Sequence, residues 1–203
     1  EELQVSYEKT RMILEGTVLA MSRIVESRDP YTAGHEQQVA KIACVISEKM
    51  LLPADRVDAI RVAGQLHDIG KIAVPSEILT KPGRLSPLEM EMVKTHCRNA
   101  YDILKAIEFP HPVAKIILQH HERMDGSGYP QGLKGDDILL EARIIGVADV
   151  IEAISSHRPY RPAKDVDVAM QEITDHRGTL YDANVVDAAL DIYRTKGRQD
   201  FLP

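Results

Sequence analysis

Apolar residues recur every three or four positions along most of the chain, which is the spacing of one face of an α-helix. The first such run ends at Asp29-Pro30, where the proline interrupts the pattern. Charged residues fill the other positions of its first half, so residues 1–13 are expected to form a linker or pairing helix outside the core. Further helices are predicted at about 30–50, 53–70, 87–107, 113–122, 139–155, 163–176 and 184–195.

Turn-forming residues separate these helices. Ser86-Pro87-Leu88-Glu89 matches a capping box, with a hydroxyl at the N-cap and a glutamate at the third helical position. Residues 74–85 are expected to form a loop, and the glycine-rich residues 124–137 the longest loop. No useful run alternates in the manner of a β-strand, and no segment repeats. The sequence predicts an all-α fold, with one helical domain over residues 14–195 and a C-terminal tail at 196–203.

Composition narrows the classes of function. The 203 residues include 31 acidic and 25 basic ones, and the net charge of −6 disfavours binding to a nucleic-acid polymer. No run approaches the roughly 20 apolar residues that would cross a bilayer, and the first residues lack a signal-peptide pattern. Cys44 and Cys97 are expected to pack in the core of a protein from a reducing compartment, the cytoplasm. The absence of an initiator methionine predicts a fragment with a fused sensory or receiver domain upstream.

Acidic and histidine residues occur within or beside apolar helical segments. Asp149 lies in RIIGVADVIEAI, where a buried carboxylate needs either a salt bridge from another helix or a metal ion. His67-Asp68 ends one apolar run and His120-His121 ends another, while His96 and His35 lie beside apolar stripes. Taken alone, His35, His67 and His96 are explained by core packing, a helix cap or a surface position, whereas two adjacent imidazoles that enter an interior cost desolvation unless something binds them.

Taken together, these five histidines and two aspartates exceed the ligands that one four-coordinate zinc requires. Imidazoles and carboxylates suit iron, manganese and zinc. A pair of such cations that shares a carboxylate generates hydroxide from a bridging water and holds the oxygens of a phosphoryl group. The sequence contains neither a Ser-His-Asp elbow nor a GxxxxGK[ST] phosphate loop. The predicted reaction class is therefore metal-assisted hydrolysis of a phosphoester.

HDIGK at 67–71 and HHERMDGSGYPQGLKG at 120–135 resemble the HD-GYP subgroup of the HD-domain phosphohydrolases. Four other segments are similar to that subgroup and occur in the same order: 28–35, 81–96, 147–150 and 155–163. The resemblance covers about residues 14–195. It implies an all-helical domain that hydrolyses cyclic di-GMP to pGpG or GMP with a hydroxide bridging two metals, and related cyclic dinucleotides are substrates of some members.

The resemblance also implies the residues of the site, with iron or manganese as the expected metals. The metal ligands it implies are His35, His67, Asp68, His96, His120, His121 and Asp149, with Asp68 as the bridge. The catalytic residues it implies are Lys71, Asp68 and Asp29. The substrate-binding residues it implies are Gly128, Tyr129, Pro130, Arg158 and Arg161. A surface lysine, a helix cap at Asp29, a rigid turn at 128–130 and two surface arginines are the structural alternatives.

The sequence departs from the HD-GYP pattern at two places. Tyr31 occupies a position where some members carry a glutamate that helps to hold a third metal, so we expect two metals and weaker binding by His35. Cys97 follows His96 where members often carry proline. The remaining histidines are expected to be surface or packing residues: His111, His157 and His176.

Two other functions remain open. One is a weakly active or inactive HD-GYP module that acts by binding a ligand or a partner such as a diguanylate cyclase. The other is a general HD phosphohydrolase of mononucleotides, which the GSGYP loop and the two arginines disfavour. Pairing of residues 3–25 in a homodimer is a further hypothesis.

Overall fold

The computed structural model describes residues 2–28, 34–156 and 165–196. Over these ranges the regular structure is helical and contains no β-strand, only an isolated bridge between Arg177 and Tyr181. The all-α prediction is confirmed. The elements are α1 (Glu2–Glu26), α2 (His35–Lys49), α3 (Ala54–Leu66), the 3₁₀ helix η1 (Ile69–Ala73), α4 (Ser76–Leu79), α5 (Pro87–Lys94), α6 (His96–Leu104), α7 (Val113–Gln119), the 3₁₀ helix η2 (Gly135–Asp137), α8 (Leu140–Ser155), α9 (Val166–Asp175) and α10 (Ala183–Lys196).

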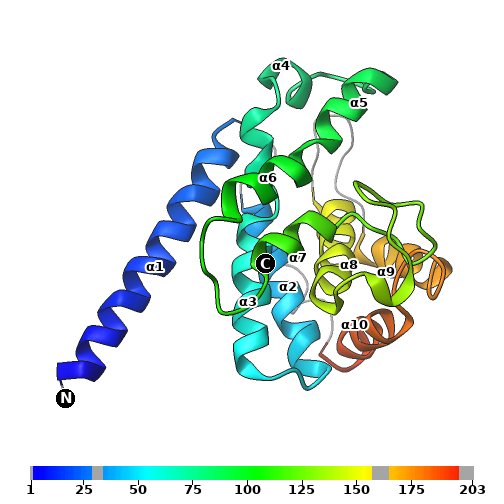
Figure 1. Cartoon of the computed structure of the whole chain (residues 1–203). Coiled ribbons are helices and arrows are strands. Elements are labelled where there is room, and N and C mark those ends of the chain that lie inside the picture. Colours follow the sequence, from blue (N-terminus) through cyan, green and yellow to red (C-terminus); the bar gives the residue numbers. More distant parts are fainter. Residues whose placement is uncertain (1, 29–33, 157–164, 197–203) are drawn as a thin grey trace.

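Helix α8 lies inside the bundle and packs against α2, α3, α7, α9 and α10 (Figure 1). It buries residues on nearly every side, including Ile144, Ile145, Val147 and Ile151. A helix that is apolar around its circumference is stable only when other elements surround it. Helix α2 instead buries one face, at intervals of three and four residues, against α3 and α8. These packing contacts hold the starts and ends of several helices close together.

Helix α1 extends away from the rest of the molecule (Figure 1). Among its described side chains only Val18, Ser22 and Val25, in its second half, are buried. Its end is tied to the body by the Glu26 carboxylate, which accepts a hydrogen bond from the Gly34 backbone N–H at 3.0 Å. Nearby, the Arg28 guanidinium donates to the Ile72 carbonyl at 2.7 Å. Among the described residues, none of the helices has both the length and the apolar composition of a membrane-spanning segment.

The capping box at residues 86–89 is confirmed. The Ser86 hydroxyl accepts a hydrogen bond from the Glu89 backbone N–H at 3.3 Å, and the Glu89 carboxylate accepts one from the Ser86 N–H at 2.6 Å. The helix that begins there is shorter than predicted, because it ends at Lys94 and α6 begins at His96. Between them, the Thr95 hydroxyl and the His96 ring donate to the carbonyls of Met92 and Val93, and such local bonds compete with the helical backbone pattern.

Three other predicted boundaries differ from the structure. Helix α3 ends at Leu66, and the chain tightens into η1 where helix was predicted to continue to residue 70. The predicted loop at 74–85 contains the single helical turn α4. Helix α2 begins at His35, because its N-cap Gly34 has φ 79°, a left-handed conformation that cannot continue a right-handed helix. The predicted start near residue 30 lies outside the described residues.

Candidate metal centre

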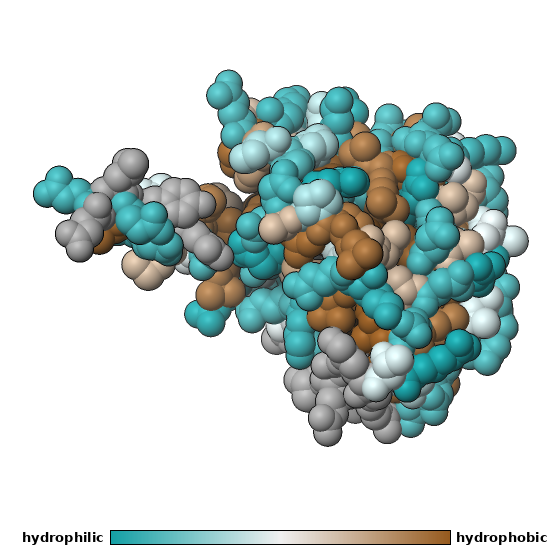
Figure 2. Space-filling model, turned by 90° about the horizontal axis from the view of Figure 1, so that it is seen from below, coloured by the Kyte–Doolittle hydropathy of each residue, from teal (hydrophilic) through white to brown (hydrophobic). Residues whose placement is uncertain are grey.

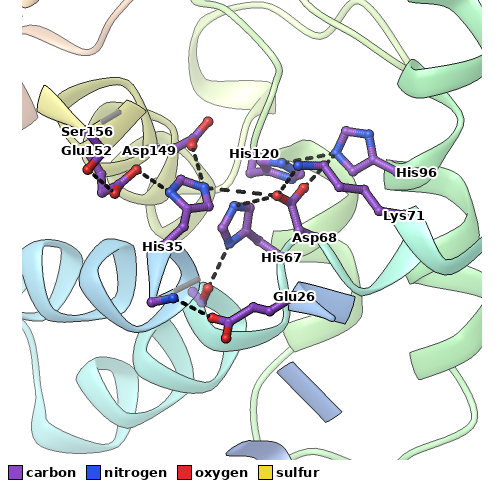
Figure 3. A network of polar contacts seen from close by, with 12 residues as sticks. Glu26, His35, His67, Asp68, Lys71, His96, His120, Asp149, Glu152 and Ser156 are labelled. Atoms are coloured by element: carbon purple, nitrogen blue, oxygen red, sulfur yellow. Dashed lines mark hydrogen bonds and ion pairs between the residues drawn. The ribbon is translucent and has the colours of Figure 1, made fainter. Parts of the chain in front are cut away.

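The predicted histidines and aspartates converge although they lie far apart in the sequence (Figure 3). They come from the first residues of α2 and α6, the residues directly after α3 and α7, and the middle of α8. Four imidazoles and one carboxylate are at most 4% exposed: His35, His67, His96, His120 and Asp68. The Asp149 carboxylate is 14% exposed and His121 is partly buried.

These residues form two groups of potential ligands. In each group one donor atom per residue lies within 4.8 Å of all the others. The first group is His35, His67 and Asp149, and the second is His96, Cys97, His120 and His121. A third set overlaps both: His67, Asp68 and His120.

Asp68 connects the two groups through its two carboxylate oxygens. Its Oδ2 lies 3.6 Å from His67 Nε2, and its Oδ1 lies 3.4 Å from His96 Nε2. The two oxygens therefore face different groups, as the carboxylate that bridges a pair of cations would.

Backbone carbonyls orient three of the imidazoles. The Nδ1–H of His67, His96 and His120 each donates to the carbonyl three residues earlier, at 2.7, 2.7 and 2.6 Å. A carbonyl can only accept, so Nδ1 carries the proton and the Nε2 lone pair is available to a metal. Hydrogen bonds of this kind commonly fix the histidine ligands of metal sites.

His35 is oriented by an acid instead of a carbonyl. Its Nδ1 contacts the Glu152 carboxylate, which also accepts a hydrogen bond from the Ser156 hydroxyl at 2.5 Å. Its Nε2 lies 3.3 Å from Asp149 Oδ1. No Arg or Lys of the described ranges pairs with Asp149, and the group that pairs with its carboxylate from another helix is the His35 imidazole.

Burial sets the protonation of most imidazoles. It lowers the pKa of His67, His96 and His121, and lowers that of His120 to about 3. These rings are therefore neutral near pH 7, which is the form that binds metal ions.

The two aspartates of the centre are deprotonated and charged. Burial opposes the ionised form of Asp68, but the charge of Lys71 and the neighbouring imidazoles hold its pKa well below the usual range. Asp149 is kept ionised in the same way, chiefly by the hydrogen bond from His35. Burial would lower the pKa of His35, but hydrogen bonds to Asp149 and Glu152 outweigh it and raise that pKa to about 10. The four neutral imidazoles around two ionised carboxylates are a donor set that fits divalent cations, and His35 would give up its proton on joining them.

Lys71 and Gly70 lie beside the bridging carboxylate. The Lys71 ammonium donates to Asp68 Oδ2 at 2.5 Å. A Cβ atom on Gly70 would lie 1.9 Å from the His96 carbonyl oxygen, so only glycine lets η1 pack this closely on the start of α6. This contact holds the segment of Asp68 and Lys71 against His96.

The loop after the histidine pair covers one side of the second group. A Cβ on Gly128 would lie 2.4 Å from Glu122 Cα, so the close approach here also requires glycine. The centroids of the Tyr129 and His121 rings lie 4.8 Å apart, and the backbone N–H of Tyr129 donates to the His121 carbonyl at 3.2 Å. Pro130 follows Tyr129 in the same loop. The Glu122 carboxylate holds the end of this loop by accepting from the N–H groups of Gln131 and Leu133, at 2.7 and 3.0 Å.

The structure thus brings most predicted site residues together, and three of them lie outside the described residues: Asp29, Arg158 and Arg161. His157 is not described either. His111 lies apart from the centre and pairs with Asp55 at 3.1 Å, and His176 pairs with Glu172.

The roles of Glu122 and Glu152 and the position of Cys97 beside the histidines were not predicted from the sequence. Glu152 carried a usable signal, because it is a second acid three residues after Asp149 in the same apolar helix. Cys97 carried a signal as well, since it directly follows a predicted ligand.

Comparisons with known proteins are consistent with this arrangement. A family model described as an HD domain matches residues 20–185. "Cyclic di-GMP phosphodiesterase response regulator RpfG" of Xanthomonas campestris pv. campestris is 43% identical over 176 residues, which are 86% of this chain and 47% of that protein. "3'3'-cGAMP-specific phosphodiesterase 3" of Vibrio cholerae is 40% identical over 170 residues, 83% of this chain and 37% of that protein.

A solved structure has the same fold. It is "Bd1817, a HDG"Y"P protein from Bdellovibrio bacteriovorus", with a TM-score of 0.65 at 18% identity, over 79% of this chain and 51% of that chain. The chain spans less than half the length of the two curated relatives named above.

Proposed function

The chain belongs to the HD domain family, and from this premise we propose that it is a metal-dependent phosphodiesterase of cyclic dinucleotides. The proposed substrate is cyclic di-GMP and the proposed products are pGpG, GMP or both. The observation that carries the proposal is the position of Asp68 between two groups of buried imidazoles, with one carboxylate oxygen facing each group.

Two divalent cations fit the donor set. His35, His67 and Asp149 would hold one, His96, His120 and His121 would hold the other, and Asp68 would contact both. Iron and manganese are the proposed metals, because both accept mixed imidazole and carboxylate ligands. When bound, the cations polarise the phosphate and lower the pKa of a coordinated water.

The chain's own residues position the reacting groups. Lys71, which donates to Asp68 Oδ2, brings a positive charge next to the phosphate and fixes the orientation of the bridging carboxylate. The ring of Tyr129 closes the site beside His121 and offers an apolar face to the nucleotide. We assign Arg158 and Arg161 to the second phosphate, because a guanidinium binds phosphate through two parallel hydrogen bonds. Asp29 is assigned as a further catalytic acid.

The substrate class has two specific candidates. The similarity to a relative named for cyclic di-GMP supports cyclic di-GMP, and the similarity to one named for 3'3'-cGAMP supports that dinucleotide as a second substrate. The two differ in one purine base, so a single metal centre serves both.

The parts of the chain have separate proposed roles. Residues 14–195 form the catalytic domain, 1–13 a linker or pairing helix, and 196–203 a tail. We propose that α1 pairs in a homodimer or connects to a sensory or receiver domain, and that a diguanylate cyclase is a second partner. The free thiols of Cys44 and Cys97 support a reducing compartment, the cytoplasm.

The test is turnover of defined substrates by the purified chain. Protein purified without oxygen is incubated with Fe²⁺ or Mn²⁺ and with cyclic di-GMP, 3'3'-cGAMP or a 3′,5′-cyclic mononucleotide, and the products are separated by chromatography. We expect hydrolysis of cyclic dinucleotides and about two cations per chain by elemental analysis.

Asp68→Ala is the diagnostic variant. It removes the oxygens that face both groups, so we expect loss of at least one cation and of turnover by a factor of 10² or more, on the order of what a lost metal function costs. Asp55→Ala changes an exposed acid far from the centre and should leave both unchanged. Intact cyclic dinucleotide under every metal would contradict the proposed activity.

A further inference from the structure

We propose that the Cys97 thiolate is an additional ligand of the cation held by His96, His120 and His121. This inference rests on the proposed metal centre and adds a sulfur donor to it. Cys97 is fully buried in the first turn of α6, directly after His96. Its Sγ belongs to the second group of potential ligands, in which all donor atoms lie within 4.8 Å of one another.

The distances suit a shared cation. Cys97 Sγ lies 3.5 Å from His96 Nε2, and His96 Nε2 lies 3.5 Å from His120 Nε2. Bonds of ordinary length, at the angles of about 90–110° that four or five donors make, would separate sulfur from nitrogen by about 3.1–3.6 Å and two nitrogens by about 2.9–3.3 Å. Both measured separations therefore lie close to the edges of a coordination polyhedron around one ion.

The neighbouring rings direct their donors toward the same space. Hydrogen bonds to the carbonyls of Val93 and Ile117 use the Nδ1 atoms of His96 and His120, so their Nε2 atoms face each other. A hydrogen bond from the Cys97 thiol to His96 would fit the 3.5 Å contact as well, but it needs only one of the three rings. The common packing of all four donor atoms favours a ligand.

Sulfur changes the chemistry of this half of the centre. The thiol proton leaves to solvent when the cation binds, and a sulfur lone pair forms the new bond. A thiolate is a softer donor than imidazole or carboxylate and shifts the preference of the site toward zinc, cobalt and iron over manganese. The two halves of the centre would then differ, with sulfur in one and only nitrogen and oxygen in the other.

Cobalt absorption tests this directly. The full chain is loaded with Co²⁺ without oxygen, bound cobalt is measured by elemental analysis, and the near-ultraviolet spectrum is recorded. We expect a sulfur-to-cobalt charge-transfer band in the unaltered chain, and its loss in Cys97→Ala. Loading at constant pH should release one proton fewer from Cys97→Ala. Cys44→Ala removes the other thiol, which lies away from the centre, and should retain the band.

The outcomes separate this inference from the proposed function. Bound cobalt without the band in the unaltered chain would exclude Cys97 as a ligand and leave the histidine and aspartate centre intact. A band lost in Cys44→Ala and kept in Cys97→Ala would also overturn the assignment. A chain that binds no cobalt would overturn the metal centre itself, and the sulfur ligand with it. The Cys44→Ala spectrum decides the question even if Cys97→Ala does not fold, because Cys97 is then the one thiol left in the sequence.

Discussion

Glu122 shows how much one side chain contributes without belonging to either group of ligands. It follows the histidine pair directly, and its carboxylate accepts hydrogen bonds from two backbone N–H groups across the glycine-rich loop. The loop between these anchors carries Tyr129, whose ring packs on His121. Glu122 is therefore a positioning residue, because it acts on the site only through the loop.

Replacing Glu122 with Ala should impair substrate binding more than metal binding. The change leaves two partly buried N–H groups without their acceptors, so the loop should leave His121. We expect KM for cyclic di-GMP to rise about tenfold, with bound metal unchanged. Glu122→Gln keeps one acceptor and should recover part of the affinity. Equal losses of metal and activity would show instead that Glu122 stabilises the metal centre.

Most residues of the centre could be predicted from the sequence, and their contacts could not. A carboxylate in an apolar helix and adjacent histidines at a helix end signal compensation by a ligand, as at Asp149 and His120. The Nδ1 bonds that orient the rings depend on backbone carbonyls, which every residue has and no motif reveals. The contacts of Glu122 with the loop and of Glu152 with His35 likewise depend on tertiary packing.

At the scale of elements, the capping box at the start of α5 offers a measurable stability effect. Ser86→Ala removes the hydroxyl that accepts from the Glu89 N–H and should reduce the free energy of unfolding by about 1 kcal/mol. Lys81 and the backbone and hydroxyl of Ser86 lower the pKa of Glu89 from 4.5 to about 2. A carboxylate with a lowered pKa stabilises the fold above its ordinary pKa, and this contribution is lost as the pH falls from about 4.5 toward 2.

Denaturant unfolding of Glu89→Gln and the unaltered chain at several pH values measures this contribution. The difference between them should be constant above pH 5 and shrink below the ordinary pKa of 4.5. A difference that grows on acidification would contradict the assigned pairing. Glu77→Gln, which replaces an exposed acid without such partners, is the control variant in the same unfolding experiment.

The existence of the helices was predictable, and several of their ends were not. The spacing of apolar residues predicted α8, and the capping box predicted the start of α5, because both are local patterns. The end of α3 was extended too far, since the close packing of Gly70 on His96 is a contact between distant segments. The break at Thr95 was missed for a similar reason, because the side chains of Thr95 and His96 bond to carbonyls of their own turn.

For the molecule as a whole, the cations should act as a stabilising ligand. The buried imidazoles and the two ionised carboxylates come together only in the folded chain, so a cation that they hold would bind that state alone. A ligand that binds only the folded chain adds about 2.7 kcal/mol when its free concentration is 100 times Kd. We expect chelation to lower Tm by several degrees and Mn²⁺ or Fe²⁺ to restore it. Asp68→Ala should show a smaller response, and an equal response would place the binding elsewhere.

Helix α1 gives a second prediction at this scale. Val5, Met12 and Ile13 are each more than 60% exposed, and Figure 2 shows apolar residues on this arm and an apolar patch on the face of the body beside it. If the arm pairs with a second copy, the 22.7 kDa chain should be dimeric in solution, measured by light scattering. Removal of residues 1–13 should give a monomer that still folds, because the buried residues of α1 begin at Val18. A monomeric full chain would exclude pairing through α1.

The wide sequence separation of His35 and Asp149, which share one group of ligands, has a consequence for biosynthesis. During translation His35 leaves the ribosome long before Asp149 does, and until then the first group lacks its carboxylate. A nascent chain that has not yet exposed Asp149 therefore cannot assemble the first group, whatever cations surround it. Delivery of the complete complement of metal has to follow the emergence of Asp149, so the supply of divalent cations from that moment on decides how many newly made copies are filled.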